Sequence, residues 1–212
     1  MTILIETHYL PCIAWFAAVS TGKQLKLEKN EHFVKQTYRN RCYINTEHGL
    51  DSLHVPVVRG PGKTKVSDVR IDYTQKWVMN HWRSVTSAYG KSAFFEYYAD
   101  ELRQRLLRKN EFLYDLNYEL LTLCLKWLRL DIVVTETMTY EVSAAVEHEN
   151  NVRDLRNLIT DRRPEQLQQV YRPVPYTQVF GNAFAANASI IDLIFCCGPE
   201  AGRIVKASAA EE

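Results

Sequence analysis

The order of apolar and polar residues predicts how the chain begins. TILIET (residues 2–7) is a short apolar run typical of a buried strand, and IAWFAAV (13–19) has the composition of a helix. KQLKLEK (23–29) alternates apolar and polar residues and predicts a second strand. A strand, a helix and a second strand are therefore expected to open the fold.

A hairpin is predicted next. RCYINT (41–46) alternates with period two, which places its apolar and polar side chains on opposite faces of a strand. EHGLDS supplies turn residues, and LHVPVV (53–58) is predicted as the partner strand, which lies at a sheet edge or carries a bulge because Pro56 has no N–H. VSDVRID (66–72) resumes the alternation and predicts another strand.

The hydrophobic period then changes to that of helices. Apolar residues recur every three or four positions from Thr74 to Gly90, from Ser92 onward, and through EFLYDLNYELLTLCLKWLRL (111–130). After these three helices, DIVVTETMTY (131–140) is typical of a buried strand.

The last third of the chain gives a weaker pattern. Residues 146–169 are charged and weakly periodic, which favours a surface helix followed by a loop. ASIIDLIFCCGPEAGRIV predicts a helix that starts near Ser189 and is broken at Gly198. These elements predict an α/β fold with a mixed sheet and a cluster of helices, and α+β is the alternative. We expect one domain over residues 1–205, with a short tail at 206–212.

Composition narrows the choice of partner and compartment. Hydrophobic residues make up 46% and charged residues 24%, as in ordinary globular proteins, and the net charge is +1. Such a balance disfavours nucleic acid as the partner, because any basic patch must be local. The apolar N-terminus lacks a basic start and contains Glu6, His8 and Pro11, so we expect no signal peptide, no membrane span and a cytoplasmic protein.

The spacing of the cysteines disfavours a metal site, and the sequence contains no nucleotide-binding motif. The five cysteines form no Cys-x-x-Cys and have no histidine at ligand spacing, which favours buried reduced thiols over a disulfide framework or a zinc site. RGPGKTK lacks the pattern of a phosphate-binding loop. The sequence specifies no metal, no cofactor and no oligomeric state.

A basic segment within HFVKQTYRNRCYI is the most informative candidate for function. Lys35, Arg39 and Arg41 all occupy odd-numbered positions. In an extended chain they would therefore point to one face and could bind a phosphate or carboxylate. Gln36 and Asn40 lie between them and add hydrogen-bonding groups. The alternative is a solvated edge strand whose cations pair with acids elsewhere.

Other polar residues have two interpretations each. His81 lies beside the apolar stripe of its helix and is either a core histidine or a general acid or base, while Arg83 points elsewhere. His8 and Tyr9 follow the first strand, where sheet proteins often contact ligands, but His8 is equally a plain loop residue. Asp192 is an ionisable group in an apolar run and needs a partner, which could be only a cap or an arginine.

Four blocks of the sequence resemble the successive motifs of the WbqC-like protein family. They are YLPCIAWFA, KQTYRNRCYI, HWRSVTSAYGKSAFFEYY and YTQVF with NASIIDLIFCCGPEA, and they run from about residue 6 to residue 201. The family patterns map onto Tyr9, Leu10, Pro11, Lys35, Asn40, Arg41, His81, Tyr89, Lys91, Ser189 and Asp192. GKSAFF, where the family has a proline, and FCCGPE, where it often has an asparagine, are departures that could affect substrate choice.

The resemblance implies a bacterial protein associated with O-antigen or other surface-polysaccharide biosynthesis. Its suggested activity is the transfer of glycine or another acyl group to an amino sugar, with a small anionic substrate such as a nucleotide sugar or an acyl donor. The expected catalytic residues are His81, Asn40 and His8. The expected substrate-binding residues are Tyr9, Lys35, Gln36, Arg39, Arg41, Arg83, Tyr89, Lys91 and Asp192. A non-catalytic protein that binds an anionic glycan precursor or a partner enzyme is the alternative.

Overall fold

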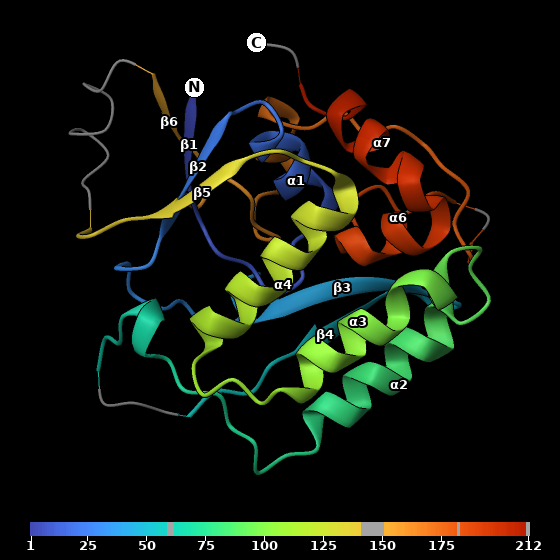
Figure 1. Ribbon diagram of the computed structural model, residues 1–212, viewed down its shortest axis with the longest axis horizontal. Helices are drawn as coiled ribbons and strands as arrows, with labels where there is room; N and C mark the ends of the chain where they lie inside the picture. Colours follow the sequence, from blue (N-terminus) through green and yellow to red (C-terminus); the bar gives the residue numbers. More distant parts are fainter. Residues whose placement is uncertain (59–61, 141–150, 182, 211–212) are drawn as a thin grey trace.

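A four-stranded parallel sheet forms one layer of the protein, as the computed structural model shows (Figure 1). The structure describes residues 1–58, 62–140, 151–181 and 183–210. The strands are β1 (Thr2–Glu6), β2 (Gln24–Glu28), β5 (Val133–Glu136) and β6 (Val152–Asp154), in the order β5-β2-β1-β6. The predicted strands at residues 2–7 and 23–29 are confirmed.

Burial explains the central position of β1. Its residues Ile3, Leu4 and Ile5 are fully buried, as expected for a parallel sheet covered on both faces. β5 lies at the sheet edge, and its Val133 is 60% exposed, so the prediction of a buried strand there is wrong about burial. The apolar run in the sequence marks the strand but does not distinguish an edge from a centre.

A two-stranded antiparallel hairpin forms a second, separate sheet. It consists of β3 (Arg41–Thr46), as predicted, and β4 (Gly49–His54). The predicted partner at 53–58 is therefore wrong by several residues, because the turn needs only residues 47–48 and Gly49 adopts a positive φ of 100°. The strand predicted at 66–72 is replaced by a 3-10 turn, η1 (Val66–Asp68), followed by isolated bridges.

Six α-helices are present in the described residues, and they pack together beside the hairpin (Figure 1). They are α1 (Ile13–Val19), α2 (Trp77–Tyr89), α3 (Phe95–Leu107), α4 (Leu113–Leu128), α6 (Ile190–Cys197) and α7 (Ala201–Ala207). All seven residues of α1 are buried, as a helix apolar on every side requires. α6 contacts the other five helices and β3, so it is the centre of the helical layer.

The α/β class of the fold is confirmed, with parallel and antiparallel pairing divided between the two sheets. The surface helix predicted over 146–169 is wrong from residue 151 onward, where the chain forms β6 and then η2 (Pro164–Gln169), a 3-10 helix. Residues 146–150 lie outside the described part. The predicted break at Gly198 is present as η3 (Gly198–Glu200), and α7 continues to Ala207.

The thiols and the helix lengths complete the description. All five cysteines are free: Cys12, Cys42 and Cys124 are buried as expected, whereas Cys196 and Cys197 are half-buried. No helix in the described ranges combines the length and apolar character needed to cross a bilayer.

The contact between α7 and α4 predicts the effect of one substitution. A methyl group at Gly202 would overlap the backbone carbonyl oxygen of Leu128. Gly202→Ala should therefore destabilise the protein by roughly 1–3 kcal/mol, despite the better helix propensity of alanine. Urea denaturation measures the difference. Lys206→Ala, at an exposed position of the same helix, should change stability by less than about 0.5 kcal/mol, and an equal effect of the two variants would contradict this packing.

Candidate functional site

Every strand of the parallel sheet ends in an acidic residue. The four residues are Glu6, Glu28, Glu136 and Asp154. Parallel strands end at the same edge, so four carboxylates gather there and need cations. Arg156 pairs with Glu28 at 2.9 Å and with Asp154 at 2.6 Å, and Lys29 pairs with Glu136. The carboxyl edge is therefore the most highly charged region of the sheet.

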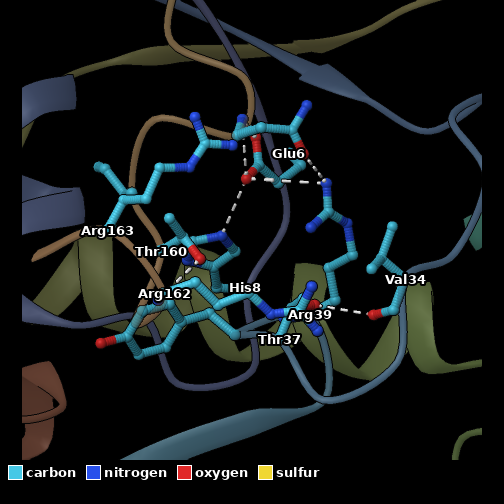
Figure 2. Close-up of a pocket in the computed structure, with 11 residues that line it drawn as sticks. Glu6, His8, Val34, Thr37, Arg39, Thr160, Arg162 and Arg163 are labelled. Carbon is cyan, nitrogen blue, oxygen red and sulfur yellow. Dashed lines mark hydrogen bonds and ion pairs between the residues drawn. The ribbon is translucent and has the colours of Figure 1, made fainter. Parts of the chain in front are cut away.

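A small pocket opens at this edge, beside the ends of β1 and β6 (Figure 2). The chain leaves β1 toward β2 on one side, whereas β6 is added on the other side, so the strand order reverses here. Ligands of open α/β sheets commonly bind at such a switch point. We call this the sheet-edge pocket; it has a volume of about 100 Å³ and is lined by Glu6, His8, Val34, Thr37, Tyr38, Arg39, Asn157, Ile159, Thr160, Arg162 and Arg163.

Arg39 is the buried cation of the pocket. Its Nε and Nη2 donate to the two carboxylate oxygens of Glu31, both at 2.6 Å, and Nη2 also donates to Asn157 Oδ1 at 2.9 Å. Glu6 Oε1 lies 3.8 Å from the same nitrogen. Burial lowers the pKa of Arg39, but the hydrogen bonds to Glu31 and the charges of Glu6 and Glu31 together outweigh burial, so the pKa is raised. Arg39 is therefore neutralised by internal carboxylates and orders the pocket wall.

Glu6 and His8 form a second buried pair. Burial raises the pKa of Glu6, but the hydrogen bond from His8 and the charge of Arg39 outweigh it and lower the pKa to about 2. His8 Nε2 lies 3.3 Å from Glu6 Oε1 and donates to this ionised carboxylate. Burial lowers the pKa of His8, so the imidazole is neutral at pH 7 and its Nδ1 carries a lone pair. That Nδ1 has no hydrogen-bond partner among the described residues.

Packing fixes the orientation of the His8 ring. The ring stacks on Tyr38 with centroids 5.3 Å apart and an interplanar angle of 25°. The backbone beside it is also held, since Tyr9 N donates to Tyr38 O at 2.8 Å. His8 therefore has one defined position in the pocket wall.

Two further arginines lie at the mouth of the pocket, on the loop that follows β6. Arg162 and Arg163 are exposed, in contrast to Arg39. Arg162 makes one long hydrogen bond, from Nη2 to Lys35 O at 3.4 Å. Figure 2 shows both side chains around the pocket together with Thr160 and Glu6. Their guanidinium groups are the cations of this pocket that a ligand can reach.

A larger hollow lies on the other side of the segment 34–40. We call it the outer groove; its volume is about 840 Å³, and it is lined by Lys35, Gln36, Asn40, His54, Pro56, Val57, Val58, Asp72, Thr74 and Gln75. Within residues 34–40, some side chains line the pocket and others line the groove. This segment is therefore a wall shared by the two hollows.

Tyr9 and His81 are buried behind the outer groove. His81 Nε2 lies 3.1 Å from His54 O, and because a carbonyl only accepts, this nitrogen carries the proton. The neutral ring then accepts the Tyr9 hydroxyl proton at Nδ1, at 2.9 Å. Burial outweighs the hydrogen bond to His54 and lowers the pKa of His81 to about 4. Both ring nitrogens are used, so the structure supports the core interpretation of His81 and leaves no free nitrogen for proton transfer.

The structure corrects the expected geometry of the basic segment. Residues 34–40 form a turn in which Gln36 has a positive φ of 56° and Thr37 Oγ1 donates to Val34 O, so parity does not place the three cations on one face. Lys35 is exposed, Arg39 is buried, and Arg41 lies on β3 near Asp161. The three do not converge on a single anion.

The remaining expected residues lie away from both hollows. Arg83 lines a separate surface hollow near the β3–β4 turn, and Lys91 is exposed between α2 and α3. Asp192 accepts hydrogen bonds from Tyr176 and from Gln178 at 2.8 Å, and thereby fastens the segment before α6. Tyr89 accepts a hydrogen bond from Asn45 N at 3.0 Å. Among the described residues, no group of three or more metal-ligating side chains is arranged to hold an ion.

Sequence reasoning missed several residues of the site. Glu6, Asn157, Arg162 and Arg163 line the sheet-edge pocket and Glu31 holds Arg39 behind it, and these residues come from three separate segments. The only available signal was weak: a charged residue directly after an apolar strand, and a pair of arginines before a proline. β6, which brings Asn157, Arg162 and Arg163 to the pocket, was hidden because it has only three half-buried residues.

The fold and site define an α/β protein with a polar pocket at the carboxyl edge of a parallel sheet and a groove beside it. The chain belongs to the WbqC-like protein family, whose model matches residues 7–162. It is similar to Rv1507c, an uncharacterized protein of Mycobacterium tuberculosis, with 27% identity over 222 residues that cover 93% of this chain and 94% of that protein. No solved structure matches the chain significantly.

The buried position of Arg39 predicts a large effect on stability. Arg39→Met should destabilise the protein by roughly 3–5 kcal/mol, because it leaves Glu31 and Glu6 without their buried cation. Urea denaturation provides the measurement. Arg70→Met is the matched control, since the Arg70–Glu111 pair is about 60% exposed and should contribute under ~1 kcal/mol. Similar losses in the two variants would contradict the assigned role of Arg39.

The depressed pKa of His81 predicts a pH dependence. The unfolded chain protonates this residue below its ordinary pKa of 6.5, whereas the folded protein does so only near 4. Stability should therefore fall as the pH drops from 6.5 to about 4, by up to roughly 3 kcal/mol. His81→Gln should lack this part of the pH dependence in urea titrations. His48→Gln, in the exposed turn, should keep it, and identical profiles for wild type and His81→Gln would contradict the buried neutral state.

Proposed function

We propose that the protein is a transferase that moves an acyl or aminoacyl group, glycine being the simplest, to the amine of an amino sugar or nucleotide-linked sugar. The proposed setting is the biosynthesis of a bacterial surface polysaccharide. The observation that carries the proposal is the Glu6–His8 pair in the sheet-edge pocket, whose neutral imidazole has an unpartnered Nδ1. Membership of the WbqC-like family supports the setting.

His8 has the properties that a general base needs. In acyl transfer the amine nitrogen attacks the acyl carbonyl and forms the new C–N bond. The nitrogen then loses a proton, and the tetrahedral intermediate collapses, which breaks the bond between the acyl carbon and the leaving group and releases that group with its electron pair. Nδ1 of His8 accepts that proton, and the ionised carboxylate of Glu6 stabilises the resulting imidazolium through Nε2. The pKa of His8, lowered by burial, keeps the ring neutral and ready to accept a proton at pH 7.

Arg162 and Arg163 supply the contact with an anionic substrate. The sequence predicted this contact for Lys35, Arg39 and Arg41, but the turn at 34–40 separates those three side chains. Guanidinium groups bind phosphate or carboxylate through paired hydrogen bonds. A pocket of about 100 Å³ holds roughly three water molecules, so it admits the reacting group of a substrate and not an entire nucleotide sugar.

Transfer activity tests the proposal directly. The protein is incubated with an acyl thioester, including a glycyl thioester, and with a panel of nucleotide-linked amino sugars, and the amide product is detected by mass spectrometry. His8→Gln should lower turnover by about 10²- to 10⁴-fold, because the base is removed. The activity of the wild type should fall as the pH drops through the lowered pKa of His8, where the base becomes protonated.

The controls separate catalysis from binding. His48→Gln removes an exposed histidine and should leave turnover unchanged. Arg162→Gln and Arg163→Gln should weaken the binding of inorganic pyrophosphate, measured by calorimetry. Full turnover in His8→Gln would rule out its role as the base. Tight binding of a nucleotide sugar without turnover across the panel would favour the non-catalytic binding protein instead.

A further inference from the structure

We infer that the outer groove is a second binding site, which takes a neutral, polyhydroxylated ring such as a hexose unit. This inference rests on the proposed function, because the acceptor of the proposed reaction is a sugar. The argument starts from size. The groove has about 840 Å³, within the usual range for small-molecule sites, whereas the pocket has about 100 Å³.

The floor of the groove holds a buried acceptor in a defined orientation. Asn40 is 1% exposed, and its Nδ2 donates to Val55 O at 3.0 Å. A carbonyl only accepts, so this contact identifies the nitrogen of the amide. The second Nδ2 proton goes to His54 Nε2 at 2.7 Å, which occupies both donors of Asn40. Its Oδ1 has no partner among the described residues and is available only as an acceptor.

A donor lies beside that acceptor. Because His54 Nε2 accepts from Asn40, the neutral imidazole carries its proton on Nδ1 and can donate. The His54 backbone is held from behind by the buried His81, which in turn is held by Tyr9. Two neighbouring lining residues thus supply an acceptor, Asn40 Oδ1, and a donor, His54 Nδ1, and sugar hydroxyl groups complement such a pair because each hydroxyl both donates and accepts.

The charges and the walls favour a neutral ligand. Lys35 and Asp72 face the groove with opposite charges, so neither a polyanion nor a polycation is favoured. The carboxylate of Asp72 is oriented by Thr74, whose N and Oγ1 donate to it at 2.9 and 2.6 Å. Val57 and its neighbours provide an apolar wall for the C–H face of a ring, and the described lining residues include no Phe, Tyr or Trp.

The shared wall connects the two sites. Asn40 Nδ2 and the Arg39 guanidinium lie on adjacent residues, yet one borders the groove and the other the pocket. The carbonyl of Arg39 accepts a hydrogen bond from the fully buried Asn117 of α4 at 2.8 Å, which anchors the wall. The segment that borders both hollows is therefore fixed in place by a buried hydrogen bond.

Saturation-transfer NMR and calorimetry with the full chain test the inference. The probes are N-acetylglucosamine as the neutral sugar, glycine as a zwitterion and inorganic phosphate as an anion. We expect the sugar to bind. His54→Phe removes the Nδ1 donor and Thr74→Val removes the hydroxyl that orients the Asp72 carboxylate, so each should weaken sugar binding by roughly 3- to 10-fold, the size of one hydrogen bond. Both residues are exposed, so these variants should fold.

Matched variants give each outcome a meaning. Thr86→Val, an exposed threonine on α2, should bind the sugar as the wild type does. Sugar binding by the wild type without any transfer activity would support the groove and count against the transferase. The inference is overturned if the sugar does not bind, if His54→Phe and Thr74→Val bind it normally, or if the groove variants weaken glycine or phosphate instead.

Discussion

The buried ion pair between Arg39 and Glu31 is the interaction on which the site depends. A buried guanidinium is costly to desolvate and needs partners, which Glu31, Asn157 and the nearby Glu6 supply to Nε and Nη2 of Arg39. The same side chain thereby links the turn at 34–40 to Glu6 at the end of β1 and to Asn157 in the loop after β6. This leaves the neutral His8 with its partner Glu6 ionised, and leaves the exposed arginines of that loop as the cations open to a ligand.

The local pattern of the sequence predicted much of the fold. β1, β2, β3, β5 and five of the six α-helices in the described residues lie where apolar runs, helical composition or hydrophobic periods indicated, because apolar burial determines both the pattern and the packing. β6 was missed since three half-buried residues carry no period, and the strand at 66–72 was predicted where isolated bridges occur. Pairing with residues far away in the sequence determines the structure of such short segments, and a local stretch of sequence does not reveal that pairing.

The candidate site was predicted only in part, for a reason that lies in the backbone. The resemblance and the charge pattern correctly drew attention to residues 35–41, but the parity argument assumed an extended chain. A positive φ at Gln36 and the hydroxyl of Thr37 instead form a turn that sends neighbouring side chains to opposite sides. The same turn produces the wall between the pocket and the groove. The turn at 34–40 therefore both separates the three cations and shapes the site.

The strand order has a consequence for how the protein is made. β6 pairs with β1 across about 150 residues of sequence, and the residues that complete the pocket follow β6. During synthesis on the ribosome, one edge of β1 therefore has no pairing partner until almost three quarters of the chain has been made. An unpaired strand edge invites association with other chains, so the nascent protein is most vulnerable to aggregation just before its pocket can form.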